Sequence, residues 1–348
     1  MSELVMKSTP SPPPVPPGFM PAEWAPHDAC WMGWPCRTEL WGNRIEKARR
    51  EYAQVALAIA QFEPVIMIVP AEHEADARKH CAGIEIRVLK IDDSWLRDSG
   101  PCFTLTPSGA LAGTAWRFNA WGKKFAKFTN DAAVGAEILR QTDAAIYESE
   151  LVAEGGAFTV DGEGTLITTE SCLLNHNRNP GWSRAEIESE LRRGLGVQKI
   201  IWLPGDPEET GTDGHVDGLA AFTAPGRVMV EVPTGPADPR YRVLQENRRA
   251  LELARDARGR SFELLPIFEA HEKEPEGNSY CRSYINFYVA NGGVVVPQYG
   301  VPGDAGALEA VRQGFPGRKV VGTDVTAISY GGGGIHCITQ QQPTPQSR

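Results

Sequence analysis

Short hydrophobic runs with the composition of β-strands recur along the chain, each beside a polar or glycine-bearing stretch. The stretches and their runs are 23–28 with 29–34, 92–98 with 101–105, 154–156 with 158–160 and 165–169, 213–217 with 219–223 and 228–232, and 283–289 with 293–297. The stretches begin at intervals of about 55–75 residues, and a glycine-rich segment around Cys337 closes the series. This spacing predicts a repeated structural unit.

Between the runs lie segments with the hydrophobic periodicity of amphipathic helices. The clearest is 183–195, where Ser183 and Glu186 form a capping-box pattern ahead of an apolar stripe from Ile187 to Leu195. The other predicted helices are 44–62, 131–141, 241–258 and 305–314, and short strands are predicted after helices at 65–69, 199–203 and 319–321. Each unit therefore combines strands with a helix.

About five such units would form one closed α/β assembly. Closure removes exposed strand edges and brings the polar stretch of every unit near one axis. We expect a single folded domain at 20–343, a proline-rich arm at 1–19 and a short tail at 344–348. The arm should be extended and disordered, because proline fixes φ and supplies no amide donor, although a role as an SH3-type ligand is an alternative.

Composition and charge narrow the functional classes. The chain has 348 residues, 41% of them apolar and 23% charged, as in an ordinary globular protein. Its seven cysteines form no CxxC pair and no zinc-finger spacing, which favours a reducing compartment, the cytoplasm, over a disulfide framework. No signal-peptide core and no run of ~18 apolar residues occurs, so no membrane association is expected. The net charge of −9 disfavours a nucleic-acid partner and favours a cationic small molecule.

The glycine-rich segment near the C-terminus carries a candidate nucleophile. Four successive glycines, 331–334, permit positive φ angles or close approach to a ligand. The following segment, 335–339, has the pattern of a short strand, which would hold Cys337 on regular structure beside this open backbone. A thiol so placed is a candidate for covalent catalysis, and the alternative is a buried structural cysteine.

Three polar stretches supply groups that could act with Cys337, namely Asp98, Glu154 and the pair His215 and Asp217. On a strand, both members of that pair would point to one face. A histidine beside a thiol and carboxylates is typical of acid–base chemistry on a covalent intermediate. Each stretch also has a structural interpretation, as a turn or a strand-end ion pair. No spacing around His215 specifies a metal ligand set, so neither a metal nor another cofactor is expected.

Taken together, these segments resemble the agmatine deiminases, peptidylarginine-deiminase-like members of the guanidine-modifying pentein superfamily. The similarity covers nearly all of 20–343, and its most specific parts are 20–28, 95–101, 118–122, 154–156, 214–217, 286–292 and 335–341. The resemblance implies a five-bladed α/β propeller of ββαβ-type repeats around a pseudo-fivefold axis. It also implies hydrolysis of agmatine to N-carbamoylputrescine and ammonia without metal or organic cofactor.

The resemblance further implies how the substrate is held. A guanidinium is planar and permanently cationic, so carboxylates bind it by bidentate pairing. Asp98, Glu154 and Asp217 would hold this group, while Trp95 and Trp121 would wall the pocket.

It implies the chemical roles as well. Cys337 would attack the guanidinium carbon, and the substrate cation would favour its thiolate. His215 would protonate the departing ammonia and then activate the water that releases the product. The backbone at Gly333 and Gly334 would lie against the flat substrate.

Several positions depart from the family pattern, namely Lys124, Ala157, Gly211, Gly218 and Gly334. None belongs to the chemical groups, but acidic or amide side chains are commonly found at 211 and 218. These departures leave open another alkylguanidine as the substrate.

Other functions remain as alternatives. An amidinotransferase or dihydrolase would use the same nucleophile, and a peptidylarginine deiminase would need a wide entrance. A non-catalytic protein that captures cationic amines would need the carboxylates but not the pair of Cys337 and His215. A homodimer is the expected oligomeric state.

Overall fold

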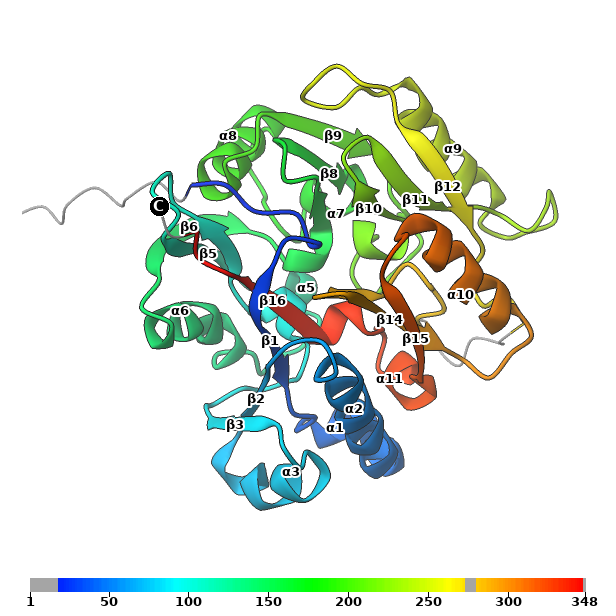
Figure 1. Cartoon of the computed structure of the whole chain (residues 1–348). Helices are drawn as coiled ribbons and strands as arrows, with labels where there is room; N and C mark the ends of the chain where they lie inside the picture. Colours follow the sequence, from blue (N-terminus) through cyan, green and yellow to red (C-terminus); the bar gives the residue numbers. More distant parts are fainter. Residues whose placement is uncertain (1–17, 273–279, 347–348) are drawn as a thin grey trace, which may run out of the picture.

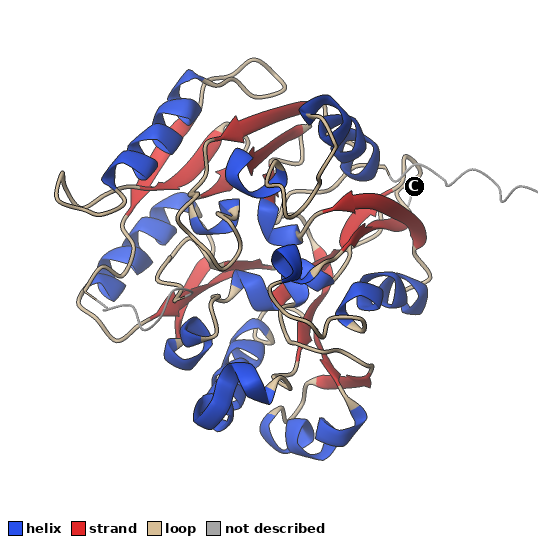
Figure 2. Ribbon diagram, turned by 180° about the vertical axis from the view of Figure 1, so that it is seen from behind, coloured by secondary structure: helices blue, strands red, loops and turns tan. Residues whose placement is uncertain are grey.

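The computed structural model describes residues 18–272 and 280–346. Within this part the strands form five small mixed sheets with the longer helices around the outside of the molecule (Figures 1 and 2). The predicted proline-rich stretch at 8–17 lies outside the described residues.

The five sheets share one topology. One sheet contains β16 (Thr339–Pro343), β1 (His27–Gly33), β2 (Val65–Val69) and β3 (Glu85–Val88). The others contain β4 (Cys102–Leu105), β5 (Leu111–Arg117) and β6 (Ala145–Val152); β7 (Phe158–Val160), β8 (Thr165–Thr169) and β9 (Lys199–Leu203); β10 (Ala220–Ala224), β11 (Arg227–Glu231) and β12 (Glu263–Ile267); and β13 (Tyr288–Ala290), β14 (Gly293–Gln298) and β15 (Lys319–Asp324). In each sheet an antiparallel pair is followed by a helix and a parallel strand, which confirms the expected ββαβ order.

The longer helices make the parallel crossovers, since strands that run in the same direction need a long connection. These helices are α2 (Ile45–Ile59), α6 (Asp131–Gln141), α8 (Arg184–Leu195), α9 (Tyr241–Leu253) and α10 (Gly303–Gly314). The predicted capping box is present on α8, where Ser183 N donates to Glu186 Oε2 at 2.7 Å and Glu186 N donates to Ser183 Oγ at 3.3 Å. The prediction of a helix to residue 258 was wrong. The α9 helix ends earlier, and the backbone amides of Arg258 and Arg260 bond to the carboxylate of Asp256, which favours a turn.

Some strands were not predicted from the hydrophobic pattern. The β5 strand contains alanine and glycine, which are poor strand formers, and β12 contains Pro266. Proline is tolerated there because β12 lies at the edge of its sheet.

The last strand of the chain completes the first sheet. β16 pairs antiparallel with β1, which places Gln341 opposite Cys30 and brings the two ends of the fold side by side (Figure 1). The side chain of Trp31 also donates to Gln342 at 2.9 Å. This pairing carries the segment just before β16, which contains Cys337, into contact with the N-terminal part of the chain. No helix in the described part of the chain is long and apolar enough to cross a membrane.

Candidate active site

Four short helical turns meet in the middle of the molecule. They are α4 (Leu96–Ser99), η3 (Gly155–Ala157), η4 (Val216–Gly218) and η5 (His336–Ile338). Each turn directly precedes the first strand of a different sheet. The repeated topology therefore brings Asp98, Glu154, His215, Asp217 and Cys337 together from distant parts of the sequence.

Two of these groups lie on turns rather than on strands, so both strand predictions were wrong. Asp217 lies in a 3-10 turn that starts after His215, and Cys337 lies in a second such turn. Asn286 holds the second turn, because its side-chain oxygen accepts from Cys337 N at 3.2 Å and its carbonyl accepts from His336 N at 3.0 Å. Side-chain bonds of this kind compete with strand pairing.

Cys337 is a buried thiol that faces carboxylates. It is 8% exposed, and its Sγ lies 3.7 Å from Asp217 Oδ2. Burial and the nearby Asp217, Cys281 and Asp98 raise the pKa of the Cys337 thiol well above its usual value. Without a cation in the site, the thiol therefore stays protonated at neutral pH.

His215 lies between two carboxylates. Its Nε2 is 3.4 Å from Glu154 Oε2, and its Nδ1 is 3.8 Å from Asp98 Oδ1. Burial opposes protonation, but Asp98, the Cys172 thiol and Glu154 together raise the pKa of His215 well above its usual value. The side chain is therefore an imidazolium that can donate a proton.

Asp98 is fixed by two donors. The indole of Trp121 donates to Oδ2 at 2.9 Å, and Gly156 N donates to Oδ1 at 3.0 Å. Gly156 also shows how closely the groups converge. A Cβ at that position would lie 2.6 Å from His215 Nδ1 and 2.9 Å from a carboxylate oxygen of both Asp98 and Asp217. The second glycine of the Glu154 stretch is therefore required by the packing of the site.

Glu154 is held by an arginine that sequence reasoning missed. Arg178 Nε donates to Glu154 Oε1 at 2.7 Å, and both side chains are fully buried. Burial opposes ionisation, but Arg178 and His215 lower the pKa of Glu154. The only signal for Arg178 in the sequence is its place in a polar loop, which gives no indication of its partner.

Glu154, Cys172 and His215 also offer three donor atoms that lie within 4.8 Å of one another. Carboxylate, thiolate and imidazole are zinc-type ligands, so these residues could hold a metal ion. One oxygen of Glu154 is already paired with the Arg178 cation, which would lie next to such an ion. The expectation that no metal is needed stays a prediction.

His336 is a second functional candidate that the sequence patterns did not single out. Its Nδ1 lies 2.9 Å from Asp217 Oδ2, and its Nε2 lies 2.8 Å from Glu23 Oε1. Burial and the nearby Arg97 oppose protonation, but Glu23 and Asp217 raise the pKa of His336. Burial acts against ionisation of Glu23 too, but His336 and Arg97 lower the pKa of that carboxyl to about 2. The adjacency of His336 to Cys337 was the one available signal.

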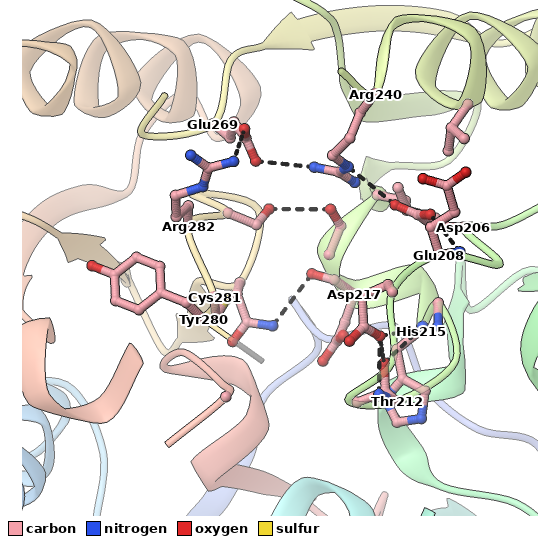
Figure 3. Close-up of a pocket in the computed structure, with 18 of the residues that line it drawn as sticks. Asp206, Glu208, Thr212, His215, Asp217, Arg240, Glu269, Tyr280, Cys281 and Arg282 are labelled. Carbon is pink, nitrogen blue, oxygen red and sulfur yellow. Dashed lines mark hydrogen bonds and ion pairs between the residues drawn. The ribbon is translucent and has the colours of Figure 1, made fainter. Parts of the chain in front are cut away.

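A cavity of about 430 Å³ opens from these groups (Figure 3). His215, Asp217 and Cys337 line one end, together with Asn286 and Gly332. The other predicted site residues lie behind this lining: Trp95, Trp121, Asp98, Glu154, Gly333 and Gly334.

The buried tryptophan and the glycines form the floor beside Cys337. Trp95 stacks on Trp41 with ring centroids 5.7 Å apart. A Cβ on Gly333 would lie 2.4 Å from the Trp95 ring, and one on Gly334 would lie 2.6 Å from Asn286 Oδ1. These two glycines therefore permit close contact with protein side chains.

The outer end of the cavity is lined by charged side chains (Figure 3). Arg240 donates to Asp206 at 3.1 Å and to Glu269 at 3.0 Å, and Arg282 donates to Glu269 at 2.6 Å. Glu208 also lines the cavity and is exposed. Within the described residues, no hydrogen bond or ion pair to the Glu208 carboxylate is present.

The departures at 124 and 211 form one contact. Lys124 Nζ donates to Gly211 O at 3.0 Å and pairs with Asp213 at 2.9 Å. Asp213 in turn accepts from Arg178 at 2.7 Å. Lys124 thus supports the loop that carries His215.

Comparisons with known proteins agree with this geometry. A family model described as "Porphyromonas-type peptidyl-arginine deiminase" matches residues 19–343. A Legionella pneumophila protein named "Putative agmatine deiminase" is 46% identical over 93% of this chain and 94% of its own length. An "Agmatine deiminase" of Pseudomonas fluorescens is 42% identical over 94% of this chain and 96% of its own. The solved agmatine deiminase of Enterococcus faecalis superposes with a TM-score of 0.90 at 34% identity, covering 94% of this chain and 96% of that one.

Proposed function

The chain belongs to the Porphyromonas-type peptidyl-arginine deiminase family, and we propose that it hydrolyses agmatine to N-carbamoylputrescine and ammonia. The observation that carries this proposal is the convergence of a thiol, an imidazolium and two carboxylates around Gly156 at the end of a cavity. A site that only captured a cation would need the carboxylates but no nucleophile and no proton donor.

The acidic surroundings of Cys337 give the substrate a part in its own activation. A bound guanidinium would pair with Asp98 and Asp217 and offset the two charges that disfavour the thiolate. The same cation lies next to the sulfur, so deprotonation of Cys337 is favoured only when substrate is present.

In the first half of the reaction, the Cys337 thiolate forms a C–S bond to the guanidinium carbon. The resulting tetrahedral adduct loses one terminal amino group as its C–N bond breaks. The His215 imidazolium supplies the proton that this group needs to leave as ammonia, and an amidino-thioether remains on the enzyme.

In the second half, neutral His215 takes a proton from water, and the oxygen adds to the amidino carbon. The C–S bond then breaks, which regenerates the thiolate and releases N-carbamoylputrescine. The imidazolium is restored at the same time, so the cycle consumes one water and releases one ammonia.

We assign Glu154 to the orientation of His215 rather than to the substrate. Its contacts with Arg178 and His215, and its position outside the cavity lining, support this role. A carboxylate behind the base fixes the ring and stabilises its charged form. The two carboxylates left to hold the guanidinium are those of Asp98 and Asp217.

The far end of agmatine carries a second cation. Among the acidic side chains of the outer cavity, Asp206 and Glu269 are paired with Arg240, while Glu208 is exposed. We propose that Glu208 contacts the ammonium group, taking the part that acidic side chains near 211 would play elsewhere in the family. A longer or shorter alkylguanidine would place its amine differently and bind less well.

Two further features belong to the same proposal. We propose that the five ββαβ sheets are the blades of a pentein propeller around a pseudo-fivefold axis, supported by their shared topology. A homodimer and a cytoplasmic location stay predictions.

The test is ammonia release from agmatine by the wild type and by Cys337→Ala, each after dialysis against EDTA. We expect turnover by the wild type and its loss in the variant, with an amidino adduct on Cys337 trapped by acid quench and mass spectrometry. Arginine and guanidinobutyrate serve as comparison substrates. Faster turnover of one of these than of agmatine would contradict the proposed substrate, and undiminished turnover by Cys337→Ala would contradict the mechanism.

A further inference from the structure

His336 is enclosed by two carboxylates that leave it one protonation state. Its Nδ1 lies 2.9 Å from Asp217 and its Nε2 lies 2.8 Å from Glu23. An ionised carboxylate only accepts hydrogen bonds, so both ring nitrogens must donate to satisfy both contacts. A ring that donates from both nitrogens is an imidazolium, and this one is 5% exposed.

This buried cation shares an oxygen of Asp217 with the nucleophile. Asp217 Oδ2 accepts from His336 Nδ1 and lies 3.7 Å from Cys337 Sγ. His336 is also the residue directly before Cys337, on the same turn. The imidazolium therefore fixes the carboxylate that faces the thiol and offsets its charge where a thiolate would form.

We propose that His336 is a positioning residue for the nucleophile, a permanently charged imidazolium that Glu23 anchors and that holds and neutralises Asp217 beside Cys337. Its importance for turnover rests on the proposed deimination, but its effect on the thiol does not. Charged hydrogen bonds between buried groups are short and strong, which suits a part that must not move during the reaction.

The other ionisable groups around this arrangement are compatible with that role. Arg97 faces Glu23 at 3.8 Å and donates through Nε to the carbonyl of His336 at 3.2 Å. The thiol itself also faces Asp98 and Cys281, and His215 acts on Asp217 from the opposite side. His27 acts on Glu23 at longer range.

The test is the rate of Cys337 alkylation by iodoacetamide as a function of pH, in the full-length wild type and His336→Gln. Mass spectrometry of the peptide that contains Cys337 separates it from the other cysteines. A glutamine can bond to Asp217 but carries no charge, so the thiolate should form at higher pH. We expect a pKa about one unit higher, and hence alkylation about tenfold slower at pH 8.

A merely structural role would give a different result. Lost packing would slow agmatine turnover equally at all pH values, whereas lost charge would leave a defect that shrinks as the pH rises. Glu23→Gln gives a second, milder variant, because its amide oxygen still accepts from Nε2 while the anchoring charge is gone. We expect the same direction of change with a smaller size, and this variant decides the question if His336→Gln does not fold.

His80→Gln is the matched control. His80 bonds to the backbone of Asp76 on α3 (Glu74–His80), away from the site, and this variant should alkylate as the wild type does. An unchanged pH dependence of alkylation in folded His336→Gln or, failing that, Glu23→Gln would overturn the proposal. Because alkylation needs no guanidine, a wild type inert toward agmatine would contradict the proposed function without affecting this result.

Discussion

At the scale of single residues, the raised pKa values of Cys337 and His215 set the pH range of the reaction. The free enzyme needs a thiolate and an imidazolium together, so activity falls at low pH when the thiol is protonated and at high pH when the ring loses its proton. Both pKa values are displaced upward, so both limbs of the bell move to higher pH.

We therefore expect kcat/KM for agmatine to peak on the alkaline side of neutrality. Its acid limb should lie above the ordinary imidazole pKa of about 6.5. The measurement is a profile of initial rates in buffers of constant ionic strength. An acid limb centred below pH 6 would show that the free enzyme does not hold these groups with raised pKa values.

Gly156 is the residue at which the geometry of the site is most sensitive. A methyl group in Gly156→Ala would meet His215, Asp98 and Asp217 at 2.6–2.9 Å, so at least one of them must shift. Displacement of a catalytic group by about 1 Å can cost about 10²-fold in rate, and we expect a loss of kcat/KM of this size for agmatine.

The matched control is Gly306→Ala, which adds the same methyl group to α10, where nothing lies within 4 Å. That variant should keep wild-type kcat/KM. Near-UV circular dichroism establishes whether both variants keep the native fold. Wild-type activity in a folded Gly156→Ala would contradict the convergence of the three groups at this position.

At the scale of elements, α8 is the helix whose boundaries the sequence defines best. Its capping box satisfies backbone amides that would otherwise lack partners, and Gly196 ends it in the left-handed conformation with φ of 66°. Ser183→Ala should lower the free energy of unfolding by about 1 kcal/mol, because the cap is lost while the helix stays packed.

Urea unfolding measures this change, and agmatine turnover should be unaltered because the cap is on the outer face of the sheet. Ser108→Ala, in the exposed turn after β4, is a control that should change stability by less than about 0.5 kcal/mol. Equal stability of Ser183→Ala and the wild type would mean that the capping box contributes nothing to the fold.

At the scale of the whole molecule, β16 links the two ends of the chain. Its loss would expose the edge of β1 and remove the buried bond from Arg97 to Gln341 at 2.8 Å. A chain that ends at Ile338 should therefore be unstable and aggregate, although it keeps every catalytic residue.

A chain that ends at Pro343 keeps β16 and tests the predicted end of the domain. It should remain monodisperse by size-exclusion chromatography with a thermal midpoint within a few degrees of the full chain. If the shorter chain that ends at Ile338 were equally stable and active, closure by β16 would not be needed for the fold.

The sequence by itself determined the elements whose formation depends on neighbours in the chain. The periodicity of α2, α6, α8 and α10, the cap at Ser183 and the hydrophobic runs of β2, β8 and β14 are local properties, and the structure confirms them. The repeat of strands and helices was readable for the same reason.

Only the tertiary structure decided which polar groups contact one another. The predicted strands at His215 and Cys337 are turns, because Asn286 and Gly156 impose conformations and contacts from distant parts of the chain. Glu154 finds Arg178, and His336 finds Glu23, across separations that no sequence periodicity reports. Local hydrogen bonding and hydrophobic spacing are encoded over a few residues, whereas a buried ion pair depends on how all five sheets are packed.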